Sequence, residues 1–387
     1  MSLSIGVKLG GTNLMAGLID ANGNIVCRGK EIAYKEKFKR EGKEPYSRED
    51  IYKLILDETN RLLNSHNLPF NRLLNNDSLN IYISFAGPID HRTNLVFRPK
   101  SIPCMRSPFN LKEEIGLYVS RNGFAASKNG ISVFVLHDAA TSALGETVAR
   151  GTLPGEKDLM MLLSGTGVGA GFLKNGKPFY GHGINGLLGE IGYFLVRDES
   201  RYHFIGYDIK GDLHIPMGYR KNKVFRHRFS TPDILTRFAK FLIKRKGNGW
   251  ELTVAKQYLA ITNKDTGANK KVSQLLAKMI KNDDNDAVRF LQIIGSELAL
   301  ALATFMAHPQ HRREKFINHI VFGGSLSSLS TIYSNELQKI VRDSLCVNLK
   351  NFNFDSASAE KISAGFVISR LDATRELMGL GAIIRSS

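Results

Sequence analysis

The stretch "SIGVKLGGTNLMAGLID", residues 4–20, decides the fold of this chain. Its first apolar residues occupy alternate positions, as on one buried face of a strand: Ile5, Val7 and Leu9. A second apolar run covers residues 14–19, and the pair Gly10-Gly11 separates the two runs. The pattern predicts a β-hairpin bent around the glycines, with Lys8 on the opposite face from the first apolar residues.

The same pattern returns at "DLMMLLSGTGVGAGFLKNGKPFYG", residues 158–181. Each hairpin is followed by an Asn-Gly pair, Asn22-Gly23 and Asn175-Gly176, which is a strong signal for a further tight turn. After the first of these turns we expect a third strand over residues 25–30. The recurrence indicates an internal duplication.

The rest of the chain alternates strand and helix patterns. We expect helices over residues 49–63, 139–150, 232–246, 271–306 and 377–387, strands within 80–90, 131–137 and 319–328, and an exposed flap over 35–43. The length of 387 residues fits two domains. We place an N-terminal α/β domain at 1–137, with the C-terminal helix (about 372–387) packed back on it, and a C-terminal α/β domain at 138–371.

Charge and cysteine content limit the class of protein to which this chain can belong. The chain has 53 basic and 36 acidic residues, a net charge of +17, and residues 197–246 hold thirteen of the basic residues against five acidic ones. We interpret residues 197–230 as a divergent, solvated basic insertion, with nucleic acid or an acidic surface as alternative partners. Three scattered cysteines, no long apolar span and no leader pattern favour a cytoplasmic protein without membrane association.

The glycine-rich turns favour phosphate binding. A dinucleotide fingerprint requires a helix directly after the glycines, but a hairpin follows here, and neither turn ends in the Gly-Lys-Ser/Thr of a Walker loop. Each glycine-rich segment alone is explained as a tight structural turn of the backbone. Two such turns, with Gly323-Gly324 after a later strand, indicate instead backbone N–H groups gathered around the phosphates of ATP.

These stretches, together with "VFVLHDAATSALGE" (133–146), "GLLGEIGYF" (186–194) and "HIVFGGSLS" (319–327), resemble the successive motifs of ROK-family sugar kinases. The resemblance extends over nearly the whole chain except residues 35–43 and 197–230. It implies a two-domain α/β fold of the actin-like ATPase type, with ATP and sugar on opposite walls of an interdomain cleft. It also implies MgATP-dependent phosphorylation of a hexose or N-acetylhexosamine, and homodimers are common among such proteins.

Asp138 is the candidate general base, because it stands where a buried strand meets a helix and matches the catalytic aspartate of the family. The alternative is an N-cap for the helix that begins at Ala139, and the two roles are compatible. On the sugar wall, Glu190 matches a glutamate that binds sugar hydroxyls, although an exposed acidic loop residue is the alternative. Gly87, before Pro88, resembles the turn that begins the sugar loop.

Three sugar-facing positions depart from the family pattern. An asparagine is replaced by His137, a second asparagine by Ser101, and a histidine by Tyr193. The cysteine-rich zinc motif is absent, and the histidines of the basic insertion form no ligand set, so we expect no structural zinc. The resemblance assigns the cofactor-binding residues as Lys8, Gly10, Gly11, Thr12, Asn13, Gly165, Thr166, Gly167, Gly323, Gly324 and Ser325.

Lys8 is the sharpest departure, because the family has an aspartate there that helps to hold magnesium. A lysine repels the metal, but its ammonium can bind a phosphate oxygen directly. We therefore expect weaker magnesium dependence, with a side chain that only reaches solvent as the alternative.

Three functions compete: an ATP-dependent sugar kinase, a catalytically impaired sugar- or nucleotide-binding homologue with a regulatory role, and a DNA-binding regulator. Regulators of this family carry a helix-turn-helix ahead of the first phosphate motif, whereas nine residues precede Gly10. Asp138 favours the kinase and Lys8 favours the impaired homologue. We expect nucleic acid not to be a partner.

Overall fold

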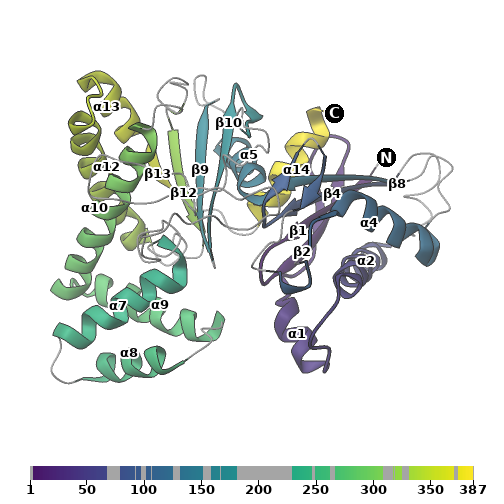
Figure 1. The fold of residues 1–387 in the computed structure, drawn as a ribbon, viewed down its shortest axis with the longest axis horizontal. Helices are drawn as coiled ribbons and strands as arrows, with labels where there is room; N and C mark the ends of the chain where they lie inside the picture. The colour runs from purple at the N-terminus through teal and green to yellow at the C-terminus, as the bar shows by residue number, and fades with distance from the viewer. Residues whose placement is uncertain are drawn as a thin grey trace.

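The computed structural model describes residues 3–67, 79–91, 93–96, 102–105, 107–124, 131–150, 158–165, 167–180, 229–245, 249–261, 266–307, 317, 319–324, 331–369 and 374–386. Within these residues, the strands form two five-stranded sheets and one three-stranded sheet. Figure 1 shows the two large sheets beside each other, with helices α5 (Asp138–Arg150) and α14 (Thr374–Ser386) between them.

The first sheet contains the predicted N-terminal hairpin. Its strands are β1 (Leu3–Leu9), β2 (Leu14–Asp20), β3 (Ile25–Arg28), β4 (Leu79–Phe85) and β8 (Ile131–His137). Their order is β3-β2-β1-β4-β8, with antiparallel pairs from β1 to β3 and parallel pairing of β4 with β1 and β8. Gly23 of the Asn-Gly turn has a φ of 79°, which glycine adopts without strain.

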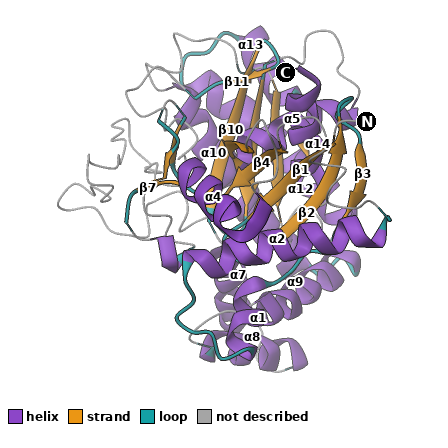
Figure 2. Ribbon diagram, turned by 90° about the vertical axis from the view of Figure 1, so that its right-hand side faces the viewer, coloured by secondary structure: helices purple, strands orange, loops and turns teal. Residues whose placement is uncertain are grey.

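The apolar side of β1 faces helices α2 (Arg48–Ser65) and α4 (Leu111–Val119), which Figure 2 shows in front of the strands. Ser47 and Asp50 form a capping box that begins α2. The three-stranded sheet comprises β5 (Ile89–Asp90), β6 (Leu95–Val96) and β7 (Phe109–Asn110). A 3-10 turn (Pro103–Met105) and a π-helical turn (Ser120–Phe124) complete this half.

The expectation of an exposed flap over residues 35–43 is wrong. Most of this stretch is helix α1 (Tyr34–Arg40). Tyr34 and Phe38, four residues apart, are buried and pack with Tyr46. The aromatic pair at helical spacing is buried on one face of the helix, and charged residues such as Lys39 and Arg40 stay in water on the other face, so the charge of this stretch does not prevent a helix.

The second sheet repeats the plan of the first. Its strands are β9 (Leu159–Ser164), β10 (Val168–Lys174), β11 (Lys177–Pro178), β12 (His319–Gly324) and β13 (Phe366–Ile368). Their order is β11-β10-β9-β12-β13, again with an antiparallel hairpin on one side of the first strand and two parallel strands on the other. This shared topology agrees with an internal duplication.

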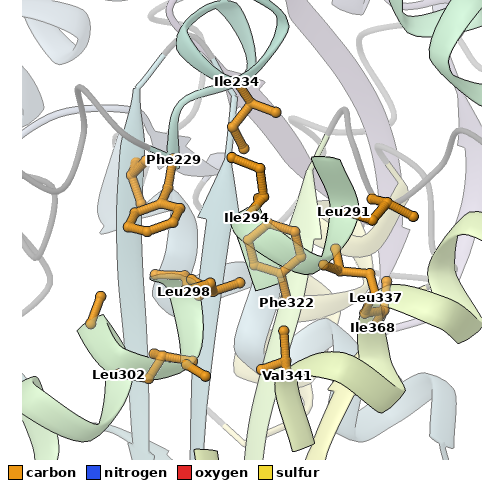
Figure 3. Packing of buried hydrophobic residues seen from close by; sticks show 14 of the residues in the cluster. Phe229, Ile234, Leu291, Ile294, Leu298, Leu302, Phe322, Leu337, Val341 and Ile368 are labelled. Atoms are coloured by element: carbon orange, nitrogen blue, oxygen red, sulfur yellow. The ribbon is translucent and has the colours of Figure 1, made fainter. Parts of the chain in front are cut away.

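Helices α10 (Asn285–Ala307), α12 (Thr331–Asn351) and α13 (Ser356–Ala364) lie on the side of the second sheet that faces away from the first sheet (Figure 1). Helices α7 (Thr231–Arg245), α8 (Trp250–Ala260) and α9 (Thr266–Lys281) pack on one another below the strands in that view. The apolar side chains of all these helices form one core with the sheet, in which Leu298 of α10, Val341 of α12 and Phe322 of β12 converge (Figure 3). By length and composition α10 would also suit a membrane span. However, 67% of its apolar stretch is buried inside the protein, as in a core helix.

Helices α5 and α14 cross at very short range. A Cβ added at Gly379 of α14 would lie 1.8 Å from the carbonyl oxygen of Thr141 in α5, and one at Gly145 would lie 1.9 Å from that of Arg375. Helix α14 also packs on strands β1 to β4, and α5 packs on β9 and β10. The domain boundary between residues 137 and 138 stays a prediction.

Candidate active site

The ends of the parallel strands β1, β4 and β8 bring the first site residues together. Lys8 of β1 pairs in register with Ser84 of β4, and Phe85 of β4 pairs with His137 of β8. Asp138 follows directly as the first residue of α5. In open α/β sheets the carboxyl ends of parallel strands are the usual place for a ligand, so the topology itself collects these groups.

The first glycine turn closes through a hydrogen bond from the Gly10 amide to the Asn13 carbonyl, with an N–O distance of 2.9 Å. The Tyr34 hydroxyl of α1 donates to the carbonyls of Gly10 and Gly11 at 3.1 and 2.9 Å. Burial raises the pKa of Tyr34, so this hydroxyl stays protonated and remains a donor. Tyr34 thus fixes the carbonyls of the turn, a role that its sequence position does not reveal.

The second glycine turn joins β9 to β10. The Gly165 amide donates to the Gly167 carbonyl at 2.9 Å, and the Thr231 amide at the start of α7 donates to the Gly165 carbonyl at 2.9 Å. Among the described residues, a Cβ at Gly165 or Gly167 would meet no atom within 4 Å, so their packing does not require glycine at either position. This openness suits backbone contact with a ligand. Thr166 lies outside the described residues.

Gly323 and Gly324, at the end of β12, pair with Leu163 and Ser164 beside the second turn. Gly324 has a φ of 113°, and a Cβ there would lie 2.0 Å from the Ser164 carbonyl oxygen. A Cβ at Gly323 would lie 2.3 Å from Arg375 Nη1. Close packing therefore explains both glycines without a ligand. The predicted neighbour Ser325 lies outside the described residues.

Asp138 has a side chain that is 24% exposed. Its Oδ1 accepts a hydrogen bond from the Ala139 amide at 2.7 Å and lies 3.5 Å from His137 Nδ1. A Cβ at Gly169 of β10 would lie 3.6 Å from His137 Cε1. The carboxylate therefore begins α5 where the first sheet meets the second hairpin, and contact with the helix N-terminus favours its negative charge.

Lys8 lies on the face of the first sheet that α14 covers. Its ammonium is 2.9 Å from Glu31 Oε1 and 3.4 Å from Glu376 Oε1. Burial by itself would lower the pKa of Lys8, but the carboxylates of Glu376 and Glu31 raise it above the ordinary value. Lys8 is therefore charged at neutral pH.

Glu376 of α14 is buried, and its Oε2 accepts a hydrogen bond from Ser84 Oγ at 2.7 Å. Burial raises the pKa of Glu376, and the nearby charge of Asp138 adds to the rise, while Lys8, Ser84 and Arg375 oppose it. A second carboxylate thus lies within electrostatic reach of the candidate base. Glu376 is not among the site residues predicted from the sequence.

An aromatic contact joins the two halves near His137. The His91 ring, which follows β5, stacks on the Tyr180 ring, which follows β11, with centroids 3.4 Å apart and an angle of 19°. Burial, together with the charge of His137, lowers the pKa of His91 to about 3. His91 is therefore neutral, and the stacked pair lies within electrostatic reach of His137, a contact that is not predicted from the sequence.

The sugar-binding residues are covered only in part. Gly87 lies in the turn after β4, where its amide donates to the Phe85 carbonyl at 3.2 Å. Ser101, Glu190 and Tyr193 lie outside the described residues, and so does nearly all of the basic insertion with its histidines. Within the described part of the chain, no group of three or more His, Cys, Asp or Glu side chains is arranged to hold a metal.

Comparison with known proteins places these features in context. A model described as "ROK family" matches residues 4–207, more than half of the 387-residue chain. A glucokinase from Halalkalibacterium halodurans is 28% identical over 200 residues, which is 51% of this chain and 51% of that protein. The chain thus spans about half the length of the curated relatives that it matches.

Two solved structures of one family, a sugar kinase and a regulator, are among those that resemble the whole chain. A ROK family glucokinase from Streptomyces griseus, in complex with glucose and AMPPNP, has a TM-score of 0.62 at 17% identity and covers 100% of both chains. A ROK family transcriptional regulator, a homologue of the E. coli MLC protein, has a TM-score of 0.61 at 15% identity and covers 99% of this chain and 78% of that one. The predicted α/β fold of the actin-like ATPases is confirmed, and the family match shows that this chain belongs to the ROK family.

Proposed function

We propose that this protein transfers the γ-phosphoryl group of ATP to a hydroxyl of a sugar, with Asp138 as the general base. The observation that carries the proposal is the position of Asp138, where the ends of β4 and β8 meet the second glycine hairpin. The glucokinase relatives support a sugar as the acceptor.

The two glycine turns would hold the phosphates. Gly10, Gly11, Thr12 and Asn13 form a closed turn next to the strand ends, and Gly165 and Gly167 form a second turn with open space outside their Cα atoms. Backbone N–H groups in such turns can surround an anion. By position, Gly323 and Gly324 would lie on the nucleotide side. Close packing against Arg375 and Ser164 also requires glycine at these two positions.

The transfer step needs little covalent chemistry from the protein. The sugar oxygen forms a bond to the γ-phosphorus, the bond from that phosphorus to the β–γ bridging oxygen breaks, and ADP leaves. The proton of the sugar hydroxyl passes to the carboxylate of Asp138. The hydrogen bond from the Ala139 amide to Oδ1 would orient the carboxylate for this proton transfer.

The acceptor would be a hexose or an N-acetylhexosamine. Gly87 and His137 would line the sugar side among the described residues. Ser101, Glu190 and Tyr193 remain predicted contacts. A histidine at position 137 carries a ring with two nitrogens, so it can still exchange hydrogen bonds with a sugar hydroxyl.

Magnesium bound to ATP neutralises phosphate charge in reactions of this kind. The residues at the first turn do not fit a metal, because the Lys8 ammonium already lies between the carboxylates of Glu31 and Glu376. A divalent cation held by these two carboxylates would first have to displace the ammonium, because both acids are already paired with it. The transfer step described above uses no metal held at this turn.

A coupled assay of ADP release, run over hexoses, N-acetylhexosamines and their epimers, tests the proposal. Asp138→Asn should lower turnover by roughly two to four decades while sugar binding persists. Asp355→Asn is the matched control, because Asp355 caps α13 by accepting from the Ser358 amide at 2.8 Å. Full turnover of Asp138→Asn, or an equal loss in both variants, would contradict the role of Asp138 as base.

A second candidate is a ROK homologue that binds sugar or nucleotide without efficient catalysis. Lys8 favours it, because the ammonium occupies the position that the resemblance assigns to an acid. Calorimetric binding of ATP and sugar with no ADP release over the whole panel would support this reading and reject the kinase.

A further inference from the structure

An aromatic stack bridges the two halves of the molecule. The imidazole ring of His91, one residue after β5, lies on the phenol ring of Tyr180, two residues after β11, with centroids 3.4 Å apart and planes inclined by 19°. Ile89 of β5 belongs to the apolar core of the first half, and Phe179, just before Tyr180, packs against the core of the second half. The stack therefore connects two parts of the protein that have separate cores.

The stack lies near the candidate base. Burial lowers the pKa of His91 and the charge of His137 adds to the effect, so the two imidazoles are within electrostatic reach of each other. His137 Nδ1 is in turn 3.5 Å from Asp138 Oδ1. Along the chain, His91 follows the turn at Gly87 by four residues. The stack thus anchors a segment that carries a predicted sugar contact.

The halves are also joined by the crossing of α5 and α14. Helix α14 is fixed to the first sheet, because a Cβ at Gly381 would lie 2.1 Å from the Gly23 carbonyl oxygen. Helix α5 is fixed to the second sheet, because a Cβ at Gly171 would lie 2.0 Å from the Ala139 carbonyl oxygen. Each helix therefore moves with its own half. Packed helices can slide by small amounts, so their crossing leaves the angle between the halves to be set by contacts elsewhere.

We propose that the His91–Tyr180 stack is a clasp that holds the two halves closed beside Asp138, separates to admit a sugar-sized molecule, and forms again once that molecule is bound. The side chain of Asp138 is 24% exposed in the closed arrangement, so an acceptor that surrounds the carboxylate needs the halves to move apart. For the sugar, this inference rests on the proposed function. The clasp itself can be tested without any substrate.

The first test uses Asp138→Cys as a reporter background. N-ethylmaleimide, a reagent comparable in size to a sugar ring, labels the thiol at position 138, and peptide mass spectrometry gives the rate. Adding His91→Ala should raise this rate by about threefold to tenfold, which is the factor that a stacked aromatic pair contributes to an equilibrium. Adding His91→Phe, which keeps a ring on Tyr180, should leave the rate within about twofold. Cys346 of α12 and the buried Cys27 are internal controls for reagent activity and for global unfolding.

The second test measures sugar exchange from NMR line shapes of ¹³C-labelled glucose, the sugar bound by the Streptomyces griseus relative. If glucose does not bind, the sugar with the highest turnover in the panel replaces it. Because the stack is present before binding and forms again afterwards, His91→Ala should raise the association and dissociation rate constants together, each by about threefold to tenfold, with Kd changed by less than about twofold. Phe134→Ala is the matched control, because it breaks a stacked pair with Tyr82 inside the first sheet, with centroids 4.7 Å apart.

Equal labelling at position 138 in the His91→Ala and His91→Phe backgrounds overturns the clasp and leaves the proposed function intact. Faster labelling in His91→Ala, with neither binding nor turnover of any panel sugar by the wild type, supports the clasp and rejects the proposed function. If Cys27 also becomes reactive, His91→Ala has unfolded the protein. Tyr180→Ala and Tyr180→Phe then repeat the comparison from the second half, and equal labelling in that pair overturns the clasp.

Discussion

Arg375 and Glu376 are consecutive residues of α14, yet their side chains bind opposite halves of the molecule. Glu376 accepts a hydrogen bond from Ser84 of the first sheet, at 2.7 Å. Arg375 donates to Ser369 Oγ, just after β13 of the second sheet, at 3.0 Å, and lies 3.4 Å from Glu146 Oε1 of α5. One helical turn therefore ties both sheets together next to the candidate site.

Removing Arg375 should cost a large fraction of the stability. The side chains of Arg375 and Glu146 are 8% and 2% exposed, so Arg375→Met removes a buried cation that lies 3.4 Å from the buried Glu146 carboxylate. We expect a loss of about 3–5 kcal/mol in the free energy of unfolding, measured by urea denaturation. Arg61→Met, which breaks an exposed pair with Glu58, should cost less than about 1 kcal/mol. Similar losses in both variants would show that burial of the Arg375 pair is unimportant.

Glycine at the crossing of α5 and α14 should be indispensable. In Gly379→Ala the new methyl group would meet the Thr141 carbonyl oxygen at 1.8 Å, so the helices must separate. We expect a loss of about 3 kcal/mol or more, or failure to fold, because backbone atoms cannot yield as a side chain can. Gly116→Ala on α4 meets nothing within 4 Å and should instead stabilise by about 0.5–1 kcal/mol. Thermal melting of both variants checks the contrast, and a harmless Gly379→Ala would refute the close crossing.

Acid should lower the free energy of unfolding, because His91 is buried in its neutral form. Its pKa of about 3 in the folded protein lies below the ordinary 6.5, so the unfolded chain binds the proton more readily. The stability contributed by neutral His91 is complete above about pH 6.5 and decreases as the pH falls toward 3. Between pH 7 and pH 5 we expect His91 to account for a loss of about 1–2 kcal/mol.

The comparison of wild type with His91→Phe isolates this effect, because phenylalanine keeps a ring against Tyr180 and cannot titrate. Urea unfolding at both pH values should give a flatter dependence of stability on pH for His91→Phe than for the wild type. Parallel pH profiles for wild type and His91→Phe would exclude burial of a neutral His91.

The hydroxyl of Tyr34 should matter to the first glycine turn. Tyr34→Phe removes the donor to the carbonyls of Gly10 and Gly11 and should cost about 1–2 kcal/mol of stability, because one acceptor is left without its partner inside the protein. ATP affinity should fall with it, since the turn loses its anchor. Tyr118→Phe, on α4, serves as the control in denaturation and calorimetric binding. Equal behaviour of the two variants would remove Tyr34 from the turn.

Local patterns in the sequence predicted the parts of the fold that depend on neighbouring residues. Alternation around Gly10-Gly11 and around Gly165 predicted both hairpins, because strand period and turn chemistry act within a few positions. The boundary between β8 and α5 at Asp138 was predicted for the same reason. The flap was mispredicted because charge in residues 35–43 concealed the Tyr34 and Phe38 pair at helical spacing.

The residues that sequence reasoning missed are joined over long distances along the chain. Ser84 and Glu376 are 292 positions apart, so no local pattern places them together. His91 and Tyr180 come from different sheets and meet only in the folded protein. Gly323 was assigned to the nucleotide from its motif, whereas Arg375, which packs against it, becomes visible only in three dimensions.

The position of α14 in the chain also sets the order in which the protein can be completed during translation. The face of the first sheet that carries Met15, Ile19 and Tyr82 is covered by Leu377 and Leu380 of α14, which leave the ribosome after both sheets. Until then an apolar surface and the Lys8 charge remain open to water, and a nascent chain in that state is exposed to association with other chains. Because α14 carries Glu376, the candidate site cannot acquire this buried acid before α14 has been synthesised and has packed on the first sheet.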